Sequence, residues 1–261
     1  MISHFQAIIL GAVQGLAEFL PISSSAHLVL VPWLFKWQDP GLAFDVALHM
    51  GTLLALLIYY REYWIAMAWS ITRGQSAERR LLQLLITASI PGAIIGLAFE
   101  KQAETIFRSP LLIAIAMAVL AILLWSFDRL SPQKRTMDEM TYWDALVIGF
   151  SQALAIIPGV SRSGATITMA RAVGVERGDS ANFSFLMATP IIAGAGLVEA
   201  RKLVHEGLDW SVGLGFISAA VFGLIAIALL IRYVRTRNYV AFAVYRLLIA
   251  ALVIAVFFAR G

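Results

Sequence analysis

The chain has 261 residues, of which 60% are hydrophobic and 14% are charged, and its mean hydropathy is +0.82. A soluble domain is about half apolar and about a quarter charged, so this composition excludes an ordinary soluble protein. The formal net charge is +4, and the absence of cysteine excludes a disulfide scaffold and thiol catalysis. We expect one integral membrane domain over residues 1–261, surrounded by membrane lipids and without a nucleic-acid partner.

The first apolar segment, residues 5–35, is interrupted. Pro21 and the run Ser23, Ser24, Ser25 divide it into pieces of about 16 and 10 residues, which are short for a helix that crosses a membrane. A re-entrant helical hairpin fits better. Irregular backbone at membrane depth is tolerated only where protein or a water-filled cavity covers it, so the tip of this hairpin is expected inside the protein.

Six apolar runs each approach the roughly 20 residues that a spanning helix needs. They lie at 42–60, 81–99, 110–127, about 180–199, 211–231 and 239–258. A second interrupted segment, residues 143–175, lies between the third and fourth runs and is broken at Pro158 and Gly159. The sequence therefore predicts an all-α polytopic membrane protein with six transmembrane helices and two broken re-entrant helical hairpins.

The two interrupted segments are copies of one another. Residues 7–27, AIILGAVQGLAEFLPISSSAH, and residues 145–165, ALVIGFSQALAIIPGVSRSGA, align without a gap and share seven residues, among them Gln14/Gln152 and Ser23/Ser161. Ordinary composition gives about one or two matches by chance. We expect internal repeats at about 4–127 and 142–258, a pattern that marks functional sites in membrane proteins.

Loop charges predict the orientation. Basic residues gather at 61–80, 128–142 and 232–238, which the positive-inside rule places in the cytoplasm, whereas 100–109 and 200–210 balance theirs with acidic residues and are expected outside. Three crossings separate the hairpins, so they enter from opposite faces. This predicts an inverted-topology repeat whose tips meet near the midplane, with both termini outside.

The second tip carries Arg162 at the expected start of a helix, where free backbone N–H groups and the positive helix end favour an anion. Ser161, Ser163 and Thr166 add hydroxyls. A buried arginine needs an anionic partner, and a planar guanidinium suits phosphate. The alternative is that Arg162 only pairs with Glu18 and holds the hairpins together.

The first tip carries Glu18, Ser24 and His27. If a helix begins near Ser24, then Ser24 and His27 share a face, which predicts a nucleophile beside a base. Glu18 could orient the histidine, hold a divalent cation or take a proton. The alternative for Ser24 is a hydrogen bond to a backbone carbonyl, which is frequent for serine in apolar helices.

Four stretches, QGLAEFLPISSSAH, PGVSRSGAT, NFSFLMATP and FAVYR, resemble the signature sequences of the bacterial undecaprenyl diphosphate phosphatases of the bacitracin-resistance type. The resemblance covers nearly the whole chain. It implies a multi-pass phosphatase of the bacterial cytoplasmic (inner) membrane, with its active site open to the periplasmic or outer side. Such an enzyme hydrolyses the terminal phosphate of undecaprenyl diphosphate, so that the carrier lipid returns to peptidoglycan synthesis.

The resemblance also implies the site residues. The catalytic residues would be Ser24, His27, Glu18 and Arg162, and the substrate-binding residues would be Gln14, Ser23, Ser25, Ser161, Ser163, Gly164 and Thr166. Some members of the family have glutamate where this chain has Gln14. The resemblance therefore implies Glu18 as the main protein ligand of a Mg or Ca ion, with diphosphate oxygens and water completing the shell.

In the expected mechanism, Arg162 and the backbone N–H groups of residues 162–164 clamp the diphosphate while Ser24 attacks the terminal phosphorus and His27 takes the proton. Water then hydrolyses the phosphoserine. Attack by His27 itself or by metal-bound water stays open, and so does the oligomeric state, a homodimer included.

Two rival functions also fit parts of the pattern. Inverted repeats with broken helices are typical of transporters, which suggests a carrier or flippase for an anionic lipid. An intramembrane serine protease is the other rival, although an arginine suits phosphate better than a peptide carbonyl. Among the remaining polar residues, Asp45 and His49 form a second polar pair near the site or a structural one. Arg246 is expected in a structural ion pair, and contact with the substrate is the alternative.

Overall fold

The computed structural model describes residues 2–72, 74, 76–99, 109–132, 134–206 and 209–260. Within these ranges every regular element is helical, and the one β-bridge, between Arg135 and Val175, is isolated. The α-helices are α1 His4–Phe19, α2 Ser24–Phe35, α3 Leu42–Tyr59, α4 Arg61–Ser70, α5 Ala77–Ala98, α7 Pro110–Leu130, α8 Tyr142–Ala153, α9 Arg162–Ala172, α10 Arg177–Glu206, α11 Trp210–Val234 and α12 Val240–Ala259. Two 3-10 turns, η2 Met137–Glu139 and η3 Leu154–Ile156, complete the order.

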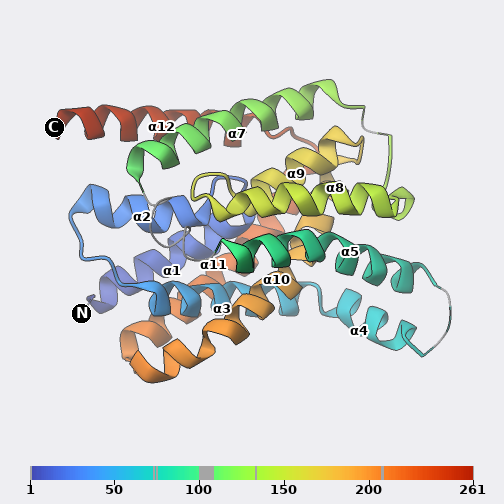
Figure 1. The fold of residues 1–261 in the computed structure, drawn as a ribbon, viewed down its shortest axis with the longest axis horizontal. Helices are drawn as coiled ribbons and strands as arrows, with labels where there is room; N and C mark the ends of the chain where they lie inside the picture. The colour runs from blue at the N-terminus through green and yellow to red at the C-terminus, as the bar shows by residue number, and fades with distance from the viewer. Residues whose placement is uncertain are drawn as a thin grey trace.

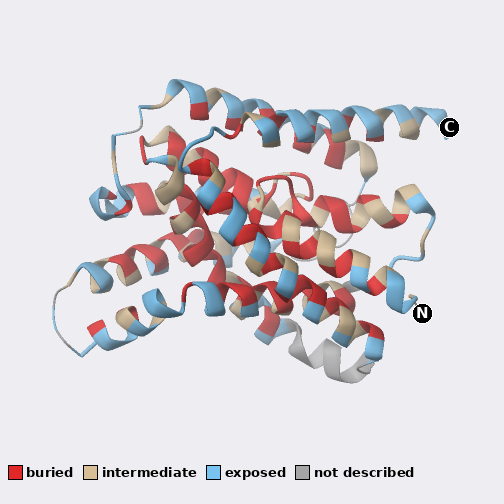
Figure 2. Cartoon of the chain, turned by 180° about the vertical axis from the view of Figure 1, so that it is seen from behind, coloured by how far each residue is buried: buried red, intermediate tan, exposed pale blue. Residues whose placement is uncertain are grey.

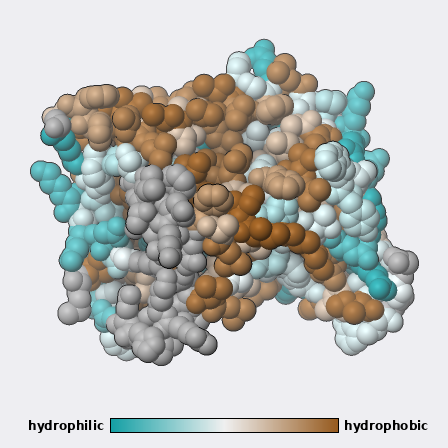
Figure 3. Space-filling model, viewed as in Figure 1, coloured by the Kyte–Doolittle hydropathy of each residue, from teal (hydrophilic) through white to brown (hydrophobic). Residues whose placement is uncertain are grey.

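The six predicted spans are confirmed. Helices α5, α7, α10, α11 and α12 are long and apolar enough to cross a membrane, and α3 together with α4 makes the sixth. The helices run along the long axis of the molecule (Figure 1). Hydrophobic side chains cover the middle of the surface in Figure 3, and hydrophilic ones gather toward its two ends. The protein is therefore a multi-pass membrane protein.

Two stretches expected as loops are partly helical. Helix α4 lies within 61–80 and bends from α3 by 72°, and α10 continues to Glu206, into the expected loop 200–210. Helix α4 was missed because its ten residues are too few and too mixed in polarity to stand out as an apolar run. Its exposed side chains include Ile65 and Trp69. Most of the expected outer loop 100–109 lies outside the described residues.

Both hairpins break where the sequence predicted. Helix α1 ends at Phe19 and α2 begins after Ser23, while α8 and η3 end at Ile156 and α9 begins after Ser161. Ser23 and Ser161 have φ values of 77° and 68°, in the left-handed region that residues other than glycine rarely adopt. Each caps its helix, because its side chain accepts a hydrogen bond from the backbone three residues later. The two copies of the repeat thus form the same unusual turn.

Each half of the chain packs its long hairpin arm on the other half. Helix α1 lies along α11, and α8 lies along α5, while α3 contacts both α10 and α11 and α7 contacts α12. In the repeat, α1 corresponds to α8 and α5 corresponds to α11. The contact of α1 with α11 and the contact of α8 with α5 are therefore equivalent. This is the packing that an inverted repeat produces.

The predicted basic loops lie together at one end of the molecule. Asp128, at the end of α7, accepts hydrogen bonds from Arg177 Nε at 2.7 Å and from the backbone N–H of Tyr239 at 3.0 Å, which places the start of α12 beside it. Arg80, near the start of α5, donates to the carbonyl of Asp138 at 2.7 Å. The two termini lie at the opposite end (Figure 1). The membrane side of each end stays a prediction.

Candidate active site

The tips of the two hairpins meet in the interior of the protein. The backbone N–H of Gly159 donates to Ser23 Oγ at 3.1 Å, and Ser163 Oγ donates to the carbonyl of Leu20 at 3.3 Å. Arg162 Nη2 donates to Glu18 Oε1 at 2.5 Å, which forms an ion pair between the tips. Figure 2 shows that buried residues concentrate around these turns. The predicted meeting of the hairpins is confirmed.

A buried arginine from α12 holds both turns. Arg246 is fully buried and donates to the carbonyls of Pro21 at 3.0 Å, Gly159 at 2.6 Å and Met117 at 3.1 Å. Broken helices leave carbonyls without helical partners, and Arg246 supplies the missing donors. The expected ion pair is not found, because the partners of Arg246 among the described residues are backbone carbonyls and not a carboxylate.

The hydroxyl of Ser24 points at a carboxylate. Ser24 Oγ donates to Glu18 Oε2 at 2.5 Å, and Gln14 Nε2 donates to the same oxygen at 3.1 Å. Arg162 occupies the other oxygen of Glu18, which is a buried residue. The carboxylate is therefore fixed in the position of a proton acceptor for Ser24.

The expected contact between Ser24 and His27 does not form. His27 Nδ1 donates to the carbonyl of Ser23 at 2.7 Å, and its Nε2 lies 2.8 Å from the hydroxyl of Tyr245. The two rings are stacked, with centroids 5.7 Å apart. Both nitrogens are engaged because the imidazole turns toward α12, whereas Ser24 turns toward α1. His27 braces the strained turn at Ser23.

A cavity of about 410 Å³ lies beside the paired tips. Five of the residues predicted for the site line it: Glu18, Ser24, Ser25, Ser161 and Arg162. Its polar wall also includes Asp45, His49 and Gln152, and the remainder is apolar or glycine. His49 Nε2 lies 3.7 Å from Glu18 Oε2, so the second polar pair noted in the sequence belongs to the cavity. The cavity combines a hydroxyl, a carboxylate and a guanidinium in one space.

The other predicted site residues do not line this cavity and shape the turns instead. Gln14 holds Glu18, and Ser23 and Ser163 join the tips. The N–H of Gly164 donates to Ser161 Oγ at 3.0 Å, so it is not free to clamp a phosphate as expected. Thr166 Oγ1 donates to the carbonyl of Arg162 at 2.8 Å and lies 2.7 Å from Ser184 Oγ.

The cavity lies toward one end of the molecule. Its residues from α3 span Asp45–Met50, in the first half of that helix, and its residues from α5, Gly92 and Gly96, are in the second half. Those from α10, between Ile191 and Gly196, begin at the midpoint of that helix and continue into its second half. All these positions are nearer the end that carries the termini than the end that carries the basic segments.

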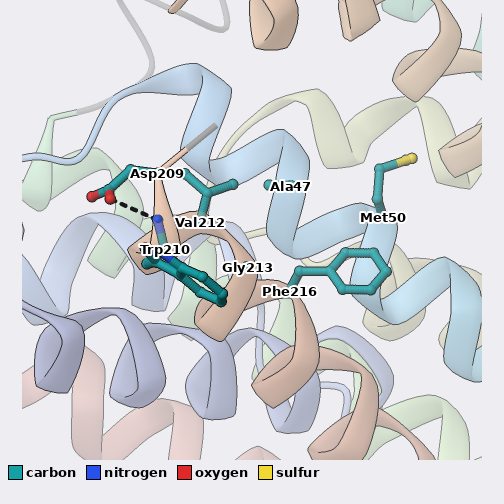
Figure 4. Close-up of a pocket in the computed structure, with 7 residues that line it drawn as sticks. All are labelled: Ala47, Met50, Asp209, Trp210, Val212, Gly213 and Phe216. Atoms are coloured by element: carbon teal, nitrogen blue, oxygen red, sulfur yellow. Dashed lines mark hydrogen bonds between the residues drawn. The ribbon is translucent and has the colours of Figure 1, made fainter. Parts of the chain in front are cut away.

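Two apolar hollows adjoin the cavity. One of about 570 Å³ shares Ala153 and Ile156 with it and is lined by α5, α8 and α9. The other, of about 390 Å³, shares Met50 and lies between α3 and the start of α11, where Trp210 and Phe216 form part of its wall (Figure 4). Both hollows therefore border the cavity through shared lining residues.

The described side chains do not form a cage for a resident metal ion. Among them there is no group of three or more His, Cys, Asp or Glu residues placed to hold one. Both oxygens of Glu18, the predicted ligand, already accept hydrogen bonds from Arg162, Ser24 and Gln14. A cation at this site would have to draw most of its ligands from the substrate and water.

Comparison with known proteins identifies the family. The model of the family described as bacitracin resistance protein BacA matches residues 7–252. A protein of Moorella thermoacetica named undecaprenyl-diphosphatase is 52% identical over 98% of both chains. Proteins of the same name from Pelotomaculum thermopropionicum and Desulforudis audaxviator are 48% and 47% identical, over 98% of this chain and 97% and 99% of theirs. The chain belongs to the BacA family of bacitracin resistance proteins.

Proposed function

We infer that this protein is an undecaprenyl-diphosphatase. It hydrolyses undecaprenyl diphosphate to undecaprenyl phosphate and inorganic phosphate, as the names of its relatives indicate. One feature of the site carries this function. Ser24 and Arg162 line the same cavity. The hydroxyl of Ser24 donates to the buried carboxylate of Glu18, and Nη1 of Arg162 is buried and has no partner among the described residues.

Arg162 is the proposed diphosphate-binding residue. Its Nη2 is taken by Glu18, but its Nη1 is buried and has no hydrogen-bond partner among the described residues. A buried guanidinium nitrogen without a partner is costly, and an anionic oxygen would satisfy it. The ion pair with Glu18 then orients the guanidinium toward the phosphate. Pairing with Glu18 and binding of phosphate were expected as alternatives, and in this proposal Arg162 does both.

Ser24 is the proposed nucleophile and Glu18 the proposed proton acceptor. Ser24 Oγ attacks the terminal phosphorus, its proton passes to Glu18, and the bond from that phosphorus to the bridging oxygen breaks, so that undecaprenyl phosphate leaves. The leaving undecaprenyl phosphate takes this proton from Glu18, so the carboxylate is ionised again. Glu18 then takes a proton from water as the water attacks the phosphorus of phosphoserine. The bond from that phosphorus to Ser24 Oγ breaks, and Glu18 returns the proton to Oγ as phosphate leaves. Positioning and charge stabilisation contribute most in such transfers. His27 supports the turn and does not enter these steps.

A divalent cation is proposed only as a companion of the substrate. Diphosphate oxygens and water would provide most of its ligands, with Glu18 as the proposed protein ligand. No step above depends on it. This proposal fits the described residues, which include no group of three or more His, Cys, Asp or Glu side chains that could hold a metal ion.

The protein is proposed to work in the bacterial cytoplasmic membrane with its cavity toward the outer side. The cavity lies away from the basic segments, which the positive-inside rule assigns to the cytoplasm. The prenyl tail would enter through an apolar hollow beside the cavity.

Phosphate release from undecaprenyl diphosphate by the detergent-purified protein, with and without Mg²⁺, tests this function. We expect release by the wild type and its loss in Ser24→Ala and Arg162→Ala, with unchanged thermal unfolding in Ser24→Ala. Ser218→Ala is the matched control, because it removes a buried hydroxyl that bonds the carbonyl of Ile8 away from the cavity. A folded wild type that releases no phosphate under any cation would overturn the phosphatase and leave lipid transport as the better reading.

A further inference from the structure

The second copy of the repeat contributes a buried amide to the cavity that the mechanism does not use. Gln152, on α8, is 4% exposed and lines the cavity wall. Neither its Oε1 nor its Nε2 has a hydrogen-bond partner among the described residues. A buried amide that lacks both partners is unfavourable, and the majority of buried polar groups in proteins avoid this state.

The repeat shows why this amide lacks a partner. Gln152 corresponds to Gln14, whose Nε2 donates to Glu18 four residues later at 3.1 Å. The residue that corresponds to Glu18 in the second copy is Ile156, which offers no acceptor. The same glutamine therefore supports the carboxylate in one copy and is left without that role in the other.

The neighbouring helix leaves room for this side chain. A Cβ added to Gly92 on α5 would lie 2.4 Å from Gln152 Nε2 and 3.2 Å from its Cδ. A glycine at this point of α5 allows the amide to lie between that helix and the cavity, and Gly92 itself lines the cavity. The amide thus packs against α5 at a glycine that also lines the cavity.

We propose that Gln152 is a phosphate-binding residue that positions the diphosphate together with Arg162. Two residues of the cavity wall carry three buried polar atoms for which the described residues offer no hydrogen-bond partner: Oε1 and Nε2 of Gln152 and Nη1 of Arg162. Two of the three are N–H donors, which suit the acceptor oxygens of a diphosphate. Oε1 of Gln152 accepts from a protonated phosphate oxygen or from water. This inference rests on the proposed function and adds a second contact to its substrate site.

Steady-state kinetics of Gln152→Leu test the proposal, because leucine keeps the approximate size of the side chain and removes both polar atoms. We expect KM for undecaprenyl diphosphate to rise about tenfold or more, and inhibition by inorganic phosphate to weaken by a similar factor. Thermal unfolding should be unchanged or shifted upward, since an unsatisfied amide is removed. Gln152→Glu should raise KM further than Gln152→Leu, because the negative charge of the glutamate repels the phosphate.

Thr189→Val is the matched control. Thr189 Oγ1 is also buried without a partner among the described residues, but Thr189 does not line the cavity. This variant should leave KM and phosphate inhibition at their wild-type values. If Gln152→Leu lowers the unfolding temperature and leaves KM and phosphate inhibition unchanged, the amide is structural and the proposal is wrong. Since wild-type turnover is measured in the same assay, that result would leave the phosphatase function intact.

Discussion

Two serines have a backbone geometry that serine rarely adopts. Ser23 and Ser161 have positive φ angles, which favour glycine, yet each uses its hydroxyl to cap the helix that follows. Ser23 also accepts the hydrogen bond from Gly159 that joins the tips. Strained backbone of this kind persists where the surrounding structure holds it, and it is frequent at functional sites.

Substitutions at Ser161 separate the strain from the cap. Ser161→Ala keeps the positive φ and loses the cap, whereas Ser161→Gly loses the hydroxyl but removes the steric cost. We expect the glycine variant to be more stable than the alanine variant by about 1 kcal/mol. Thermal unfolding in one detergent measures the difference, and an alanine variant as stable as the glycine variant would contradict the strain.

Arg162→Lys tests whether a planar fork is needed at the second tip. One guanidinium nitrogen of Arg162 pairs with Glu18 while another has no partner, and a lysine ammonium lacks this geometry. We expect phosphate release to fall about 10²-fold although the charge is kept. Phosphate release at the wild-type rate by this variant would show that a point charge is sufficient.

The sequence predicted the position of most of these residues but not all of their partners. Glu18, Ser24 and Arg162 could be placed together because the repeat and the loop charges bring both tips to one point. The direction of the His27 side chain could not be predicted, because its Nε2 lies at hydrogen-bond distance from the hydroxyl of Tyr245, more than two hundred residues later in the chain. Gln152 was visible as a repeat identity, but only the structure shows that its amide lacks a partner.

At the scale of the elements, each hairpin is a helix broken at a turn that needs outside donors. Gly159 has a φ of 99°, and a Cβ there would lie 2.5 Å from the carbonyl of Ile113 on α7, so the turn packs against α7 as closely as backbone allows. Arg246 then satisfies carbonyls in both turns. The breaks were predictable from proline and glycine, whereas the arginine that holds them was not, because its partners are backbone atoms.

Arg246→Met should destabilise both hairpins. The substitution leaves buried carbonyls without donors, at about 1–3 kcal/mol for each unsatisfied group, and we expect a large fall in unfolding temperature. Arg260→Met is the control, because Arg260 also donates to two carbonyls, those of Trp33 and Leu34, but is exposed. Equal unfolding temperatures for the two variants would show that Arg246 does not stabilise the two turns.

At the scale of the whole molecule, charge counting and helix parity predict which end faces the cytoplasm. The chain has no cysteine, so single cysteines report position without background. An impermeant maleimide applied to intact cells should label Gln38→Cys, in the exposed link between α2 and α3, and should not label Thr72→Cys, after α4. Labelling in the reverse pattern would invert the topology and place the cavity on the cytoplasmic side.

The arrangement of arms between the halves has a consequence for biosynthesis. The main partner of α1 is α11, and about 190 residues separate them. At about 5–20 residues per second, the ribosome takes roughly 10 to 40 s to deliver that partner after α1 is made. During this interval the face of α1 that carries Gly11 and Gly15 lacks the helix whose backbone later packs against it. This face of the nascent chain therefore meets lipid, water or the translocon until the last quarter of the protein is synthesised.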